Sequence, residues 1–163
     1  MGFLDAVKAF FTNYLLVSAI VAWITAQIFK IFTGVYKDRR INLTLLLFST
    51  GGMPSSHSAT VCATATCCAY VEGFHSTSFA IACVFAFVVM YDAMGVRRAV
   101  GEQAKVLNEI IFDIANNKPF AFENGLKEIM GHTPLQVFFG MLLGILVGWV
   151  FPWLCNTPPY YAA

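Results

Sequence analysis

The chain has 163 residues, of which 58% are hydrophobic and only 12% charged, with a formal net charge of +1. This composition excludes an ordinary soluble domain, in which about a quarter of the residues are charged. No basic tract indicates a nucleic-acid partner. We therefore expect a single integral membrane domain over residues 1–163, with an all-α fold: a polytopic membrane helical bundle with about four membrane helices plus short interfacial or re-entrant helices.

The first 33 residues predict two helices. Residues 1–13 lack the basic region and cleavage site of a secretory signal, and their aromatic and apolar residues favour a short interfacial helix. A first span follows over residues 14–33, long enough for a hydrocarbon core of about 30 Å. Lys30 lies near its end, where a lysine either snorkels to the head groups or reaches inward to a lipid phosphate.

A polar nonapeptide interrupts the apolar sequence after residues 41–48, which are too short to span and are expected to be interfacial or re-entrant. It reads Gly51-Gly52-Met53-Pro54-Ser55-Ser56-His57-Ser58-Ala59. Pro54 ends a loop, and Ser55 or Ser56 is a good N-cap for a helix that runs to about Val71. His57 then lies at the first turn, where hydroxyls, backbone N–H groups and the helix dipole suit phosphate, although an ordinary capped helix start with a chance histidine has the same sequence.

Small residues recur at every fourth position in two of the expected helices. They are Ala59, Ala63 and Cys67 in the helix after the nonapeptide, and Gly140, Gly144 and Gly148 in the last span, residues 134–153. This spacing lets helix backbones approach closely, so we expect the two helices to pack together, although the glycine face could equally serve a homodimer. Residues 77–91 form the span between them. The five cysteines lack metal-type spacing and are expected to be packing residues.

The distribution of positive charge predicts the topology. Of the ten Lys and Arg residues, three follow the first span (Lys37, Arg39, Arg40) and five follow the third (Arg97, Arg98, Lys105, Lys118, Lys127). With four crossings these segments share one side, which the positive-inside rule makes cytoplasmic, and both chain ends lie on the other. The nonapeptide, residues 92–98 and residues 131–134 then all emerge on the cytoplasmic face.

Residues 92–98 bring charge to that face. Asp92 ends a helix, where the dipole disfavours an anion, so we expect it to have a partner. Arg97 and Arg98 follow a glycine at which the chain can turn, and they either grip a phosphate or act as topology anchors paired with Asp92 or Glu102. Residues 101–117 predict an amphipathic helix and residues 120–130 a short surface helix.

The third motif is Gly131-His132-Thr133-Pro134. Thr133 is a natural N-cap and Pro134 a natural first helical residue, so His132 precedes the last span. Two histidines at two helix N-termini can serve as nucleophile and general acid in phosphoryl transfer, whereas either one alone would more simply be an interfacial residue. His75 falls on the opposite face, and we assign it no role.

These motifs together resemble the divergent branch of the type 2 phosphatidic acid phosphatase superfamily, related to acid phosphatases and vanadium haloperoxidases, over residues 30–148. The resemblance implies metal-independent removal of phosphate, often from a lipid, through a phosphohistidine. Pro54 to His57 match the mainstream Pro-Ser-Gly-His motif with Ser56 in the glycine place. The later Ser-Arg motif, followed six residues on by the nucleophilic histidine, has no counterpart, because Gln103 and Ala104 stand there. By elimination we place the nucleophile at His132, oriented by Gln136 or Asp92.

We therefore expect a membrane lipid-phosphate phosphatase that needs no metal or cofactor, with its substrate arriving from the cytoplasmic leaflet. The expected catalytic residues are His57, His132 and Asp92, and the expected phosphate-binding residues are Ser55, Ser56, Arg97, Arg98 and Lys30. The alternative is a catalytically inactive protein that binds, translocates or scaffolds lipid phosphates. Phosphatidic acid, phosphatidylglycerophosphate and polyprenyl phosphates all suit the same pocket.

Overall fold

The computed structural model describes residues 2–38, 52–117 and 131–160, and within these ranges the chain forms helices and no strand. The helices are α1 (Phe3–Phe11), α2 (Tyr14–Asp38), α4 (Ser56–Glu72), α5 (Thr77–Met94), α6 (Val96–Asn117) and α7 (Pro134–Leu154). The predicted all-α membrane bundle is confirmed: three segments, Tyr14–Thr33, Thr77–Ile111 and Pro134–Leu154, are long and apolar enough to cross a membrane. The expected helices at residues 41–48 and 120–130 lie outside the described residues.

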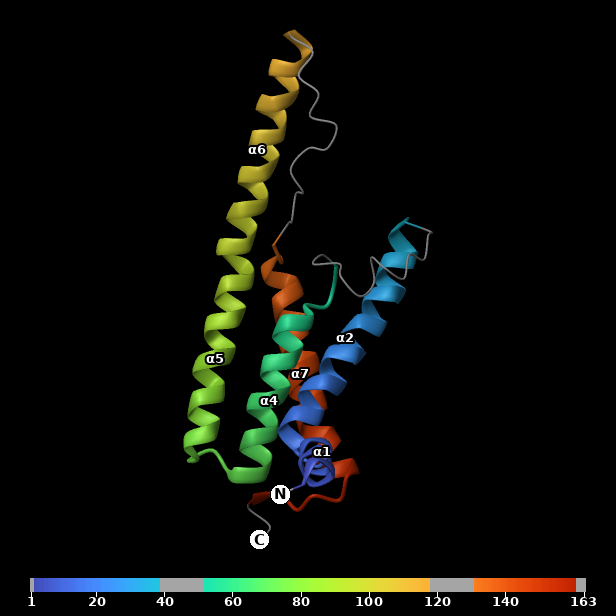
Figure 1. Ribbon diagram of the computed structural model, residues 1–163, viewed down its shortest axis with the longest axis vertical. Helices are drawn as coiled ribbons and strands as arrows, with labels where there is room; N and C mark the ends of the chain where they lie inside the picture. Colours follow the sequence, from blue (N-terminus) through green and yellow to red (C-terminus); the bar gives the residue numbers. More distant parts are fainter. Residues whose placement is uncertain (1, 39–51, 118–130, 161–163) are drawn as a thin grey trace.

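Helix α4 is the centre of the bundle, with α2, α5 and α7 packed around it (Figure 1). At 17 residues it is about 25 Å long, shorter than the hydrocarbon core of about 30 Å. Eleven of its residues are buried, and all of these except Val61 and Tyr70 are Ser, Ala or Cys. Such small side chains let three neighbouring helices approach the same short helix from different directions.

The contact between α4 and α7 depends on the three glycines of α7. A methyl group placed on Gly144 would collide with the carbonyl oxygen of Ala59 and lie 2.8 Å from the Cβ atom of Cys62. A methyl group on Gly148 would meet Ala63 and Thr66 in the same way. The predicted packing of the two helices is thus confirmed, and their backbones touch. Because α4 occupies the glycine face, a homodimer, which stays a prediction, would have to use another surface.

Helices α5 and α6 differ from the sequence expectation at their junction. A turn after Gly95 and a helix from residue 101 were expected, but α6 already begins at Val96. The Gly95 N–H donates to the Tyr91 carbonyl (2.9 Å), and the Ala99 N–H donates to the Gly95 carbonyl (3.0 Å), so helical hydrogen bonding continues through the break. The two helices are nearly in line, and α6 extends beyond the bundle (Figure 1).

The two ends of the bundle carry different features. The N-terminus, the α4–α5 turn and the C-terminal tail share one end (Figure 1). There the ring of His75 packs on the ring of Tyr160, with centroids 4.9 Å apart. The N-termini of α4 and α7 lie at the other end. His75 is therefore remote from His57 and His132, as expected; which end faces the cytoplasm stays a prediction.

Candidate functional site

The end of the bundle opposite the N-terminus joins four helix ends: the starts of α4 and α7, and the C-terminal parts of α2 and α5 (Figure 1). Backbone hydrogen bonds tie them together. The Ser55 N–H donates to the Gln136 carbonyl (2.9 Å), and the His132 N–H donates to the Ala93 carbonyl (3.1 Å). The Thr33 hydroxyl donates to the Met53 carbonyl (2.9 Å). The three predicted motifs therefore converge. The Ala93 carbonyl and Thr33, which no sequence signal singled out, help to hold them.

The two serines before His57 have different structural roles. Ser55 is fully buried and is the N-cap of α4, with its hydroxyl oxygen accepting from the Ser58 N–H (3.4 Å). Ser56 is the first residue of α4, and its hydroxyl oxygen accepts from the Lys30 ammonium (3.1 Å). Of the two, Ser56 is the one linked to a cation and is better placed to contact an anion.

Lys30 points into the bundle. Its exposed fraction is 8%, and its Nζ atom reaches from α2 to α4 to bind Ser56. Of the two orientations that the sequence allowed, snorkelling or inward, the structure has the inward one. An ammonium withdrawn from water costs free energy unless an anion or several hydrogen bonds accompany it. A phosphate group would supply both the charge and the acceptors.

His57 and His132 face each other across the α4–α7 contact. Their ring centroids are 5.6 Å apart, with the ring planes tilted by 58°. His132 is buried and His57 half-buried. Each histidine lies at the N-terminal end of a helix, where the backbone dipole favours negative charge. The close helix contact at Gly140, against Ser55 and Ser58 on either side of His57, holds the two helix starts together.

The Gln136 side chain favours one tautomer of the His132 ring. The Gln136 side-chain oxygen accepts from the Thr133 N–H (3.0 Å), completing a capping box, and lies 3.2 Å from the Nδ1 atom of His132. An amide oxygen accepts and never donates, so this contact is a hydrogen bond in the tautomer that carries the proton on Nδ1. In the neutral ring, the lone pair is then on Nε2. Of the two orienting residues considered from sequence, Gln136 makes this contact.

The remaining predicted site residues are on the α5–α6 column. Asp92 is half-buried in the last turn of α5, next to the Ala93 carbonyl that binds the His132 backbone. Arg97 and Arg98 are in the first turn of α6, but their side chains lie outside the described part of the structure. Their phosphate-binding role stays a prediction, as does the catalytic role of Asp92.

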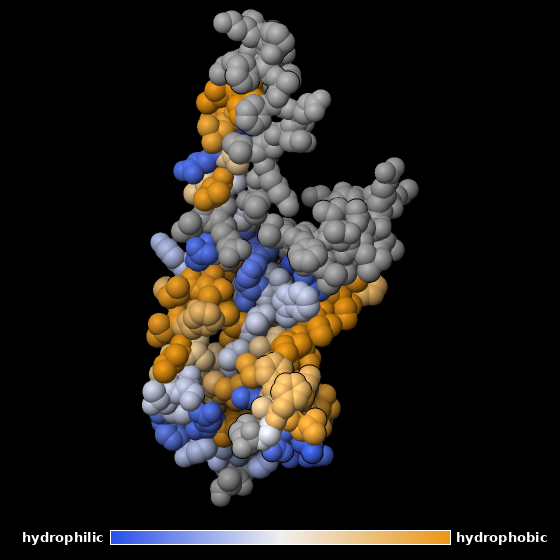
Figure 2. All heavy atoms as spheres, in the orientation of Figure 1, coloured by the Kyte–Doolittle hydropathy of each residue, from blue (hydrophilic) through white to orange (hydrophobic). Residues whose placement is uncertain are grey.

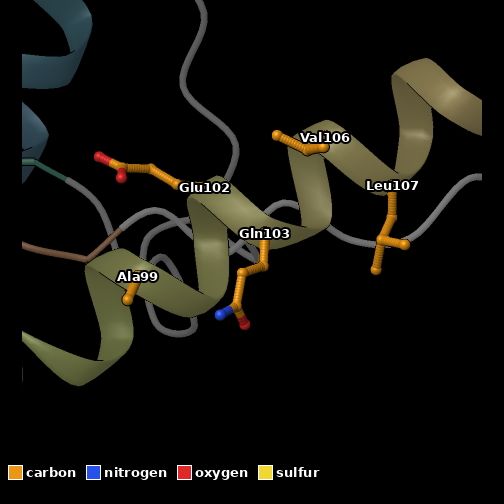
Figure 3. Close-up of a pocket in the computed structure, with 5 residues that line it drawn as sticks. All are labelled: Ala99, Glu102, Gln103, Val106 and Leu107. Carbon is orange, nitrogen blue, oxygen red and sulfur yellow. The ribbon is translucent and has the colours of Figure 1, made fainter.

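A separate hollow of about 550 Å³ lies on α6, lined by Ala99, Glu102, Gln103, Val106 and Leu107 (Figure 3). All five side chains come from one helix, and those of Glu102 and Gln103 point in different directions (Figure 3). A binding site needs polar groups that converge from several elements. The candidate site is therefore the pair of histidines with Lys30 and Ser56. Over the described ranges, no three His, Cys, Asp or Glu side chains group as metal ligands would.

Fold and site together define a helical membrane protein in which two histidines and a buried lysine meet at the starts of two membrane-embedded helices. The chain belongs to the Divergent PAP2 family, whose profile matches residues 11–147. It is 44% identical over 146 residues to an uncharacterized membrane protein of Bacillus subtilis (strain 168), YuiD, covering 83% of this chain and 92% of that protein. No solved structure matches the present chain. The resemblance inferred from the motifs is thereby confirmed.

Proposed function

We propose that the protein is a membrane phosphatase that removes phosphate from a lipid phosphate through a phosphohistidine, without a metal ion. The observation that carries the proposal is the contact between His57 and His132, with ring centroids 5.6 Å apart beside the Lys30–Ser56 pair. The pair supplies a cation and a hydroxyl for the phosphate oxygens. The two rings supply a nucleophile and a proton donor.

The tautomer of His132 assigns the roles. With the proton held on Nδ1 by Gln136, the Nε2 lone pair attacks phosphorus while the bond from phosphorus to the lipid oxygen breaks. Protonated His57 gives its proton to the departing alkoxide, so the lipid leaves as an alcohol. Water then attacks the phosphohistidine, His57 accepts a proton from it, and the phosphorus–nitrogen bond breaks to release phosphate. Lys30 and the two helix N-termini stabilise the charge on the phosphoryl oxygens.

The contact between the rings sets a geometric requirement. The attacking nitrogen needs about 3 Å to phosphorus, and the donor nitrogen needs about 3 Å to the leaving oxygen on the opposite side. The two reacting nitrogens must therefore be at least roughly 6 Å apart. Ring centroids at 5.6 Å leave little space for a phosphoryl group. His132 is buried and held by Gln136, whereas His57 is half-buried. We therefore expect the His57 side chain to rotate away when a phosphate binds.

The second candidate is a lipid-phosphate binding or translocating protein without turnover. The observation that favours it is the same ring contact, because a resting site closed between its two reactive groups also fits a protein that only binds. The absence of the Ser-Arg-to-His spacing points the same way. In this case Lys30 and Ser56 would still hold the phosphate, and both histidines would be ligands.

The test is phosphate release by the purified protein from a panel of lipid phosphates, with EDTA present. We expect turnover to survive chelation, to be lost in His57→Ala and His132→Ala, and to persist in the matched control His75→Ala. A ³²P-labelled lipid should leave acid-labile label on the wild type and none on His132→Ala. Lipid binding without any phosphate release would contradict the phosphatase and support the second candidate.

A further inference from the structure

One face of α4 is left uncovered by the bundle. Ala59 and Ala63 pack with Ala22 and Ala26 of α2. Val61 and Cys62 pack with Ala86 of α5, and the glycines of α7 cover a third side. Among the described residues, α2 and α5 do not pack against each other. The strip of α4 between them is therefore partly open over its first turns, from His57 to Thr64, and it ends at the buried Cys67 and Cys68.

The strip begins at the candidate site. Its residues are His57, Thr60 and Thr64, which recur at helical spacing on one face and are each half-buried. Figure 2 shows this face of the molecule, with paler surface in the middle between the hydrophobic surfaces of α5 and α2. The strip thus forms the floor of a groove whose walls are two apolar helices.

The groove offers hydrocarbon surface despite its threonines. The Thr60 hydroxyl donates to the Ser56 carbonyl (2.8 Å), and the Thr64 hydroxyl donates to the Thr60 carbonyl (3.0 Å). Because both hydroxyls bond within α4, neither needs a partner from the groove. The side chains of Thr60 and Thr64 are also short, so the floor of the groove lies below the walls formed by α2 and α5.

We propose that this groove holds the hydrocarbon chain of the lipid whose phosphate group lies at Lys30, Ser56 and His57. The proposal rests on the proposed phosphate site, although it does not require turnover. Two features select this occupant: the groove is continuous with His57, and a buried ammonium at its end complements an anionic head group. From His57 to Thr64 the strip is about 10 Å long, enough for the part of a chain nearest the head group within one leaflet of roughly 15 Å.

The test compares two probes in nanodiscs of zwitterionic phosphatidylcholine: dioctanoyl phosphatidic acid, and glycerol 3-phosphate, which has a related head group but no chains. Thr64→Phe fills the groove, Thr64→Val keeps its volume, and Val84→Phe adds the same ring on the exposed side of α5. Only Thr64→Phe should weaken binding of the two-chain lipid, by about tenfold, the loss of roughly two buried methylene groups. Binding of glycerol 3-phosphate should not change. Equal binding of the lipid by all variants, or no binding by the wild type, would overturn the proposal that the groove holds the lipid chain.

Crosslinking to the wild type tests the same point without a substitution that could disturb folding. A phosphatidic acid with a diazirine in its chain should label the α4 peptide that contains Thr60 and Thr64, and competing phosphatidic acid should prevent this. Labelling spread evenly over α5 and α7 would overturn the proposal. A lipid that binds in the groove but is not hydrolysed would refute the phosphatase alone, whereas hydrolysis unaffected by Thr64→Phe would refute the groove alone.

Discussion

Replacing Gly140 by alanine should damage the candidate site, whereas the same replacement at Gly148 should damage only stability. Both glycines touch α4. A methyl group on Gly140 would collide with the Ser55 carbonyl and lie 2.9 Å from the Cβ of Ser58, and one on Gly148 would lie 2.8 Å from the Cβ of Thr66. To move the nearest carbonyl oxygen, that of Ser55 or of Ala63, out to the 3.4 Å of ordinary contact, the helices must separate by about 1 Å at either glycine.

The cost to folding should be alike for the two variants. Overpacking costs about 1–3 kcal/mol, and the better helix propensity of alanine offsets up to about 1 kcal/mol of it. A net loss of roughly 1–2 kcal/mol should lower both thermal midpoints similarly. The effect on the site should differ, because Ser55 and Gln136 share a backbone hydrogen bond next to Gly140, while Gly148 is about 12 Å further along α7.

The assay is phosphate release or lipid-phosphate binding, measured below both thermal midpoints so that only folded protein contributes. A displacement of up to about 1 Å between His57 and His132 should reduce turnover in Gly140→Ala at least about tenfold, since misplacements near 1 Å cost on the order of a hundredfold. Gly148→Ala should stay within about twofold of the wild type. Equal losses of activity in the two variants would refute the view that α4–α7 packing positions the histidines.

Three further outcomes follow from the site. Lys30→Met should weaken binding of inorganic phosphate by about tenfold or more. The thermal midpoint without ligand should be equal or higher, because removing a buried ammonium relieves its desolvation cost. A lower midpoint with unchanged phosphate binding would indicate a structural lysine instead. In ¹⁵N spectra of histidine-labelled protein, the wild type and Gln136→Glu should both show the His132 proton on Nδ1. Gln136→Leu should lose that preference, because its side chain has no acceptor. Retention of the Nδ1 proton in Gln136→Leu would contradict the role of the amide oxygen. Ser56→Ala should weaken phosphate binding more than Thr60→Ala, because the Ser56 hydroxyl binds Lys30 whereas the Thr60 hydroxyl donates to the Ser56 carbonyl within α4. Equal losses of affinity in a phosphate titration would argue against Ser56 as a phosphate ligand.

The helices and their order could be predicted because their signals are local. Ser55 and Thr133 cap α4 and α7 as their sequences indicate, and α2 and α7 begin where expected. The glycine spacing also predicted a long-range contact, since a repeated absence of side chains has few uses in a membrane other than close packing. Each of these features can be read within a few residues of sequence.

Other features depend on the tertiary structure and could not be predicted. Lys30 had two solutions at a span end, of which snorkelling is the usual one, and only the position of Ser56 on another helix selects the inward one. The junction at Gly95 was misplaced because glycine permits a turn without requiring one, and here the hydrogen bonds of the helix continue through it. Gln136 was one of two candidates to orient His132, and its 3.2 Å contact with Nδ1 depends on the capping box that turns the Gln136 side chain back towards Thr133.

The composition of α4 has a consequence for how the protein is made. A helix of 17 residues built largely from Ser, Ala, Thr and Cys has little affinity of its own for lipid, and it is absent from the segments apolar enough to insert independently. We expect it to enter the bilayer as a hairpin with α5 and to settle only when α7 offers its glycine face. Since α7 is synthesised after α4 and α5, His57 and His132 cannot meet until α7 has left the ribosome. The proposed site should therefore assemble only when α7 joins the bundle.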